Sequence, residues 1–216
     1  MAKPAGMQTV AGIRIPDSAL ARDAQAFAWE HSPAFLQRHC ERSYVFGALA
    51  TSAAGLEAQE ELAYIAAVLH DLGLTERYGG ERRFEVDGAE AARDWATANG
   101  LSLDETQVVW DAIALHTSLG IADVRSPECA LIHWGTGVDV AGLFLDRLDP
   151  AAVHEVFAAF PRDGFVDGIS ELAEAAARRA PAAYAMTWLA ATANRCCGGG
   201  LPSSEDMLGQ DPFGDA

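Results

Sequence analysis

Two adjacent residues with metal-ligating side chains, His70 and Asp71, end an apolar stretch of the sequence, LAYIAAVLHDL at positions 62–72. The apolar residues of this stretch recur at helical spacing, which predicts a helix that faces a core. A charged aspartate buried there is destabilising unless it is paired or coordinated. For an isolated dipeptide, a partly exposed pair at a helix end next to Gly73 is the better interpretation. A metal site therefore requires further ligands from elsewhere in the chain.

Three more potential ligands, His39, His116 and Asp139, lie on apolar or small-residue stripes of separate predicted helices. Taken singly, an inward histidine is more often a hydrogen-bonded core residue than a metal ligand. Together with His70, these residues favour one convergent site over four unrelated core positions.

The remaining histidines are interpreted as structural. His31 lies at a helix boundary, and His154 lies beside Glu155 on a solvated face. His133 precedes Asp139 by six residues, so at about 100° per residue it points roughly away from that side chain.

Two imidazoles and two carboxylates would come from His39, His70, Asp71 and Asp139. This set suits one divalent transition metal, Zn²⁺ or Fe²⁺ first and Mn²⁺ or Co²⁺ next. Four protein ligands leave room for water only if the coordination number reaches five or six. The ion would lower the pKa of such a water to about 7–9, so that it ionises near neutral pH.

The composition is that of a folded protein of one domain, with 216 residues, half of them apolar and 21% charged. Its 15 Lys and Arg against 31 Asp and Glu give a net charge of −16, which disfavours nucleic acid and anionic membranes as partners. No apolar run approaches the roughly 20 residues of a membrane-spanning helix, and the N-terminus lacks the apolar core of a secretory signal. We expect a cytoplasmic protein that acts on a small molecule; a homo-oligomer is allowed but not required.

Helical periodicity predicts an all-α fold, and strand-like alternation is nearly absent. Ser102-x-x-Glu105 is a capping box, and Ser126-Pro127 and Asp149-Pro150 are further helix starts. The expected helices cover 17–30, 33–54, 56–72, 89–99, 102–117, 127–145, 150–160 and 167–195, the last interrupted at Pro181, with a loop at 75–88.

Three parts follow from this pattern. An N-terminal segment, 1–16, precedes a helical domain at 17–197. A glycine-rich, acidic stretch at 198–216 has no periodicity and predicts a flexible tail.

Several longer stretches carry a family resemblance. They are HCERSYVFG (39–47), HDLGLTE (70–76), RFEVDGAEAAR (83–93), VWDAIALHTSLGIA (109–122) and PECALIHWGTGVDV (127–140). With them the sequence resembles the HD-domain superfamily of helical metal-dependent phosphohydrolases and their relatives, and most closely its cyanamide hydratase-like branch. The family's ligand order of His, His-Asp and Asp is matched by His39, His70-Asp71 and Asp139. The resemblance implies a single-domain HD-type helical bundle with its core at 33–148.

The sequence departs from the phosphohydrolase pattern after the His-Asp pair. Those enzymes often carry a lysine a few residues later, whereas here the segment reads HDLGLTE and Lys3 is the only lysine of the chain. The missing ammonium lowers the expectation of a phosphate substrate. Four arginines could still replace it: Arg42, Arg77, Arg82 and Arg83.

The resemblance implies hydration of a small nitrile-type substrate such as cyanamide, which would give urea. His116 is the candidate proton shuttle, since its unperturbed pKa near 6.5 suits that role, and it could also be a further ligand. Asp71 would be both a ligand and a catalytic residue. Phe84, Glu85 and Asp87 could cover the substrate, or simply form a solvated loop. The predicted substrate contacts are completed by Thr117, although helix-end capping explains that residue equally well.

Three alternatives stay open. The first is phosphoester hydrolysis, on a nucleotide or another ester, at the same metal centre. The second is a di-iron oxygenase, which needs extra histidine ligands. Beyond the four ligands named above, the sequence offers only His116 at an inward position. The third is a non-catalytic helical module with a structural metal, although such sites are usually closed and rich in cysteine.

Overall fold

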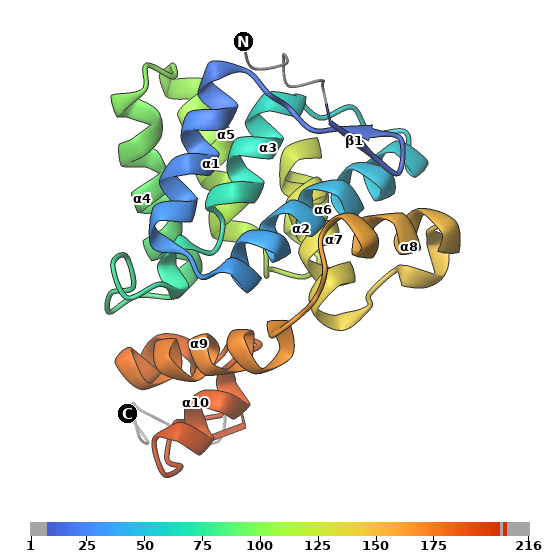
Figure 1. The fold of residues 1–216 in the computed structure, drawn as a ribbon. Helices are drawn as coiled ribbons and strands as arrows, with labels where there is room; N and C mark the ends of the chain where they lie inside the picture. Colours follow the sequence, from blue (N-terminus) through green and yellow to red (C-terminus); the bar gives the residue numbers. More distant parts are fainter. Residues whose placement is uncertain (1–7, 204, 207–216) are drawn as a thin grey trace.

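The computed structural model describes residues 8–203 and 205–206. Within these ranges the protein is helical apart from one short hairpin, so the all-α prediction is confirmed (Figure 1). None of the described helices is long and apolar enough to cross a membrane. The elements are β1 (Thr9–Val10), β2 (Ile13–Arg14), α1 (Ala19–His31), α2 (Ala34–Ala53), α3 (Glu60–Leu69), α4 (Phe84–Ala98), α5 (Leu103–Leu115), α6 (Ala122–Arg125), α7 (Pro127–Ala141), α8 (Pro150–Ala159), α9 (Phe165–Arg179) and α10 (Ala190–Cys196).

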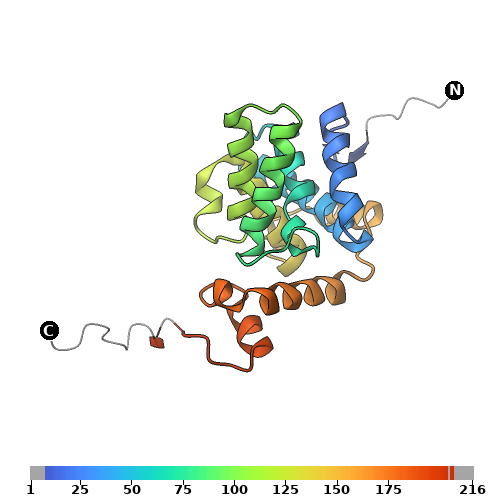
Figure 2. The same ribbon diagram turned by 90° about the vertical axis from the view of Figure 1, so that its left-hand side faces the viewer.

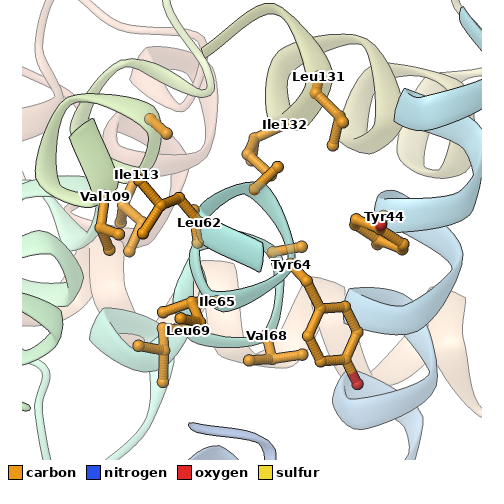
Figure 3. Packing of buried hydrophobic residues seen from close by; sticks show 14 of the residues in the cluster. Tyr44, Leu62, Tyr64, Ile65, Val68, Leu69, Val109, Ile113, Leu131 and Ile132 are labelled. Carbon is orange, nitrogen blue, oxygen red and sulfur yellow. The ribbon is translucent and has the colours of Figure 1, made fainter. Parts of the chain in front are cut away.

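The short helix α3 lies at the centre of the bundle and contacts α1, α2, α5 and α7. Every residue from 62 to 69 is buried, so this helix is covered on all of its faces. Figure 3 shows side chains of the neighbouring helices around it, among them Tyr44, Ile113 and Ile132. A helix packed on all sides has little freedom to move, and the residues at its end, His70 and Asp71, are fixed with it.

Three of the predicted helix starts are confirmed. The capping box opens α5 at Ser102. Ser126 and Asp149 cap α7 and α8, because each side chain accepts a hydrogen bond from a backbone N–H of the first turn. The first helix is capped by Ser18 instead of Asp17, one residue later than predicted.

Two helices are shorter than predicted. The central helix begins at Glu60 instead of residue 56, and after Leu69 the chain continues into a 3-10 turn at Leu72–Leu74. Helix α7 ends at Ala141, four residues early, because Gly142 takes a left-handed conformation with φ 66° that stops a helix.

The predicted loop at 75–88 is wrong in its last five residues, because α4 begins at Phe84. The backbone N–H of Phe84 donates to the hydroxyl of Tyr184 at a distance of 2.8 Å. The two residues are 100 positions apart in the sequence. A first-turn donor that is satisfied by so distant a side chain leaves no local capping signal. Glu85 and Asp87 therefore lie in the first turn of a helix and not in a flexible loop.

Helices α2 and α7 approach each other closely at two glycines. A Cβ atom on Gly47 would lie 2.1 Å from the carbonyl oxygen of Leu131, and one on Gly135 would lie 1.8 Å from that of Ser43. Each helix thus presents a glycine to the backbone of the other, and no side chain fits between them.

Helices α9 and α10 form a C-terminal unit that lies against one end of the bundle (Figures 1 and 2). The break predicted at Pro181 separates the two helices. The unit shares an apolar core with Leu74 and Phe84 of the bundle, so it is packed onto the bundle. In the predicted tail, the Leu201 N–H donates to Asn194 Oδ1 at 3.1 Å, and residues 204 and 207–216 lie outside the described part.

We expect Gly135→Ala to lower the free energy of unfolding by about 3 kcal/mol, because the added methyl group meets a backbone oxygen of α2. Gly137→Ala is the matched control in the same helix. Its Cβ would meet only the Leu143 side chain, at 3.4 Å, and replacing a helical glycine gains up to about 1 kcal/mol. Urea denaturation measures both variants, and equal stabilities would contradict the close backbone contact.

Candidate metal centre

Four helices bring the candidate ligands into one buried cluster. His39 comes from α2, His70 and Asp71 follow the last residue of α3, and His116 follows the last residue of α5. Asp139 lies near the end of α7. The exposed fraction of each of these residues is 4% or less.

His39, His70 and Asp71 form a triad whose ligand atoms point at one another. His39 Nε2 lies 3.3 Å from His70 Nε2 and 3.5 Å from Asp71 Oδ2, and His70 Nε2 lies 3.2 Å from the same oxygen. Two ligands bound tetrahedrally at about 2.1 Å from one ion are about 3.4 Å apart. The triad therefore fits a divalent transition metal in both its ligand types and its spacing.

Every imidazole near the triad is oriented by a hydrogen bond from Nδ1. A carbonyl or carboxylate oxygen can only accept, so each Nδ1 carries a proton, and in the neutral ring each Nε2 presents its lone pair. The acceptors are the Asp139 carboxylate for His39 (2.6 Å) and the backbone oxygens of Ala67 for His70 (2.7 Å), of Ile113 for His116 (2.6 Å) and of His116 for His133 (2.7 Å).

His70 and His116 use the same local device. Each stands directly after a helix and donates to the carbonyl three residues earlier, Ala67 and Ile113 respectively. The last carbonyls of a helix lack a partner within the helix, so they are available to these side chains. The helix end thereby sets both the tautomer and the direction of the ligand.

The triad favours a cation beside Asp71. Burial by itself would raise the pKa of Asp71, but the charge and hydrogen bond of His70, together with His39 and His116, hold that pKa below its ordinary value. Burial opposes the charged form of His70, yet the Asp71 carboxylate raises the pKa of that histidine. The pKa of His116 is lowered to about 4 by burial and by the charge of His70, which leaves its imidazole neutral at pH 7.

Asp139, predicted as a fourth ligand, lies behind His39. One of its oxygens accepts from His39 Nδ1, and the Arg42 guanidinium spans both oxygens with bonds of 2.7 and 2.8 Å. Burial opposes ionisation of this carboxyl, but the bonds from His39 and Arg42 bring its pKa down to about 2. The geometry gives Asp139 the part of a partner that orients His39, and direct ligation by Asp139 stays a prediction.

His133, interpreted from the sequence as pointing away from the site, lies in the wall of the same pocket as the triad. The interpretation assumed that Asp139 defines the pocket side of α7. In the structure Asp139 faces Arg42 on α2, whereas His133 faces the end of α5, where it donates to the His116 carbonyl. Six residues rotate a helix by about 240° net, so two side chains at this spacing can face different neighbours and both be buried.

Two of the predicted substrate contacts line the pocket, and the others do not. Phe84 and Thr117 line the pocket, and the Phe84 ring lies 5.6 Å from that of His116. Glu85 is fully buried behind them and accepts hydrogen bonds from Arg83 and Thr117. Burial would raise the pKa of Glu85, but these bonds and the nearby His116 lower it. Asp87 accepts from Gly80 and Arg82, and so organises the preceding loop instead of the site.

The pocket that borders the triad has a volume of about 230 Å³. Its polar groups are the triad, His116, His133, Thr117 and Thr136. The rest of its wall is apolar and includes residues of α7 and of the C-terminal unit. A small molecule in this pocket would contact the ligand atoms on one side and hydrocarbon on the other.

The chain belongs to the HD domain family. The model of that family matches residues 36–149, more than half of the chain, and this range holds the triad, Asp139 and both pocket histidines. HD domains are metal-dependent hydrolases, and a buried His-His-Asp group fits that class. A search of curated proteins finds no match to the chain. The predicted kinship to the cyanamide hydratase-like branch stays a prediction.

We expect the purified protein to bind a divalent transition metal and His70→Ala to lose it, because the variant removes one of three converging ligand atoms. Metal analysis by mass spectrometry after dialysis measures the content, with an expected loss of at least about 10-fold. His154→Ala is the matched control, since that histidine is exposed on α8. Equal metal content in both variants would contradict the assignment.

Proposed function

We propose that this protein is a metal-dependent hydratase that adds water to a small, uncharged nitrile-type substrate such as cyanamide. The observation that carries the proposal is the charge of the pocket. No arginine or lysine lines it among the described residues, and its one ionised carboxyl is that of Asp71. A phosphoester would bring negative charge into a largely apolar pocket that has no arginine or lysine to hold it.

The arginines that could replace the missing lysine are engaged elsewhere. Arg42 is held by Asp139, and Arg83 is held by Glu85 and Thr117. Arg82 pairs with Asp87, and Arg77 lies over the Tyr78 ring. Recruiting any of them to a phosphate would break an existing contact, and two of those contacts hold buried carboxylates at or behind the site.

A divalent ion held by the triad would supply a water of lowered pKa and a positive charge beside the substrate nitrogen. In the reaction, the water oxygen bonds to the nitrile carbon as one carbon–nitrogen π bond breaks. The nitrogen takes a proton, and the resulting imidic acid tautomerises to an amide, which is urea when the substrate is cyanamide. Atoms and electrons balance without an oxidant or reductant.

His116 is suited to move the proton. Its Nδ1–H is bound to the Ile113 carbonyl, so the unprotonated Nε2 remains to accept a proton from water and return it to nitrogen. This Nε2 lies 3.9 Å from Asp71 Oδ1, within reach of a group held beside the triad. Phe84 and Thr117 complete the wall next to it.

A second candidate is a two-metal oxygenase, and the position of His133 favours it. With His116, it adds two imidazoles whose Nδ1 atoms are bound to carbonyls and whose Nε2 atoms are left for ligation. A content of two irons per chain, together with oxygen consumption, would support this candidate over the hydratase.

Other predictions accompany the proposal. The charge of −16 still disfavours nucleic acid and anionic membranes as partners. The cytoplasmic location and a homo-oligomeric state stay predictions as well.

We expect metal-loaded protein to form urea from cyanamide and His70→Ala to lower kcat/KM by at least about 100-fold, because the triad loses its hold on the ion. Urea is measured with a coupled urease assay. His154→Ala should match the wild type. A generic aryl phosphate and a panel of nucleotides form the second arm of the experiment. Metal-dependent phosphate release without urea formation would overturn the proposal.

A further inference from the structure

The apolar side of the pocket is built as a continuous stripe on α9. Phe165 stacks on the His39 ring at a centroid distance of 4.9 Å, and Ile169 and Ala173 line the pocket at the next two positions of the same helical face. The two α9 residues that line the pocket are four positions apart, which is about 6 Å of helix. Phe165 itself does not line the pocket, so α9 contributes the wall from Ile169 to Ala173, next to the residue that packs on His39.

Other apolar residues line the pocket together with this stripe. Val140 and Ala141 line it from the end of α7, Leu143 from the turn that follows, and Trp188 from the segment before α10. None of these side chains can hydrogen-bond to water in the pocket apart from the indole N–H. Val140, Leu143 and Trp188 are at least 40% exposed, so an apolar group bound between them would remove apolar surface from water, which is favourable.

The size of the pocket exceeds what cyanamide needs. One water molecule occupies roughly 30 Å³ in the liquid. If each non-hydrogen atom of a ligand takes about that volume, the 230 Å³ of the pocket holds about eight such atoms. Cyanamide has three such atoms, which leaves space for about five more beside hydrocarbon walls.

We infer that the natural substrate is an uncharged nitrile with an apolar chain or ring of about five carbon atoms. This inference rests on the hydratase function proposed above. The nitrile lies at the triad, and the apolar group lies between α7 and the stripe on α9. Ile169, Ala173 and Trp188, the part of this wall that comes from the C-terminal unit, lie outside the range matched by the family model. The C-terminal unit is therefore the part of the chain that selects the substrate.

A homologous series tests the inference on the wild-type protein. We expect kcat/KM to rise about fourfold with each methylene from acetonitrile to valeronitrile, because each methylene buries apolar surface in the pocket. Cyanoacetate, which carries a carboxylate at the same place, should be a poorer substrate than propionitrile. A flat or falling series, or equal rates for these last two, would overturn the inference.

A pair of variants on α9 locates the effect. Ala173→Trp fills the pocket and should lower the ratio of kcat/KM for valeronitrile to that for cyanamide by at least about 10-fold. Ala175→Trp makes the same change on α9 at a residue that does not line the pocket, and it should keep the wild-type ratio. An unchanged ratio in Ala173→Trp, with the fold verified by circular dichroism, would contradict the proposed position of the chain.

Direct binding separates the two proposals. Calorimetric titration of the metal-loaded protein with acetamide and valeramide, the product amides, requires no turnover. If no nitrile is hydrated, cyanamide included, the hydratase function fails. In that case tighter binding of valeramide, by about fourfold per methylene, still supports the apolar pocket, whereas equal affinities overturn it. If cyanamide alone is hydrated, the function stands and the inference fails.

Discussion

The close approach of α2 and α7 is the constraint on which the site depends. Gly47 and Gly135 allow the two backbones to touch, and this contact brings Asp139 to within 2.6 Å of His39 Nδ1. The Arg42 guanidinium, completely buried, closes the group. A buried carboxylate between an imidazole and an arginine is stable only while both partners remain, since loss of one leaves an uncompensated charge. Packing of two helices thus fixes the direction of a ligand.

The other ligands are fixed by helix ends. His70 and His116 each follow a helix and donate to one of its unpartnered carbonyls. The supporting helix α3 is buried on all sides, so its end cannot swing. Ligands held in this way need little reorganisation when an ion binds, which is the physical basis of a preformed metal site.

The C-terminal unit completes a site that the bundle leaves open on one side. The Tyr184 hydroxyl accepts from the first turn of α4, Phe165 stacks on His39, and Trp188 lines the pocket. The same unit therefore stabilises the helix that carries Phe84 and supplies the apolar wall. In this arrangement the family core would supply the chemistry and the added helices would select the molecule on which it acts.

The sequence by itself determined the all-α fold, most helix starts and the inward position of His39, His70 and His116, because capping and helical periodicity are local properties. Only the tertiary structure decided which side of α7 faces the pocket. His133 lines it and Asp139 supports His39, since the neighbours of α7 and not its own period set these directions. The start of α4 and the apolar wall also came from residues about 100 positions away, which local patterns do not encode.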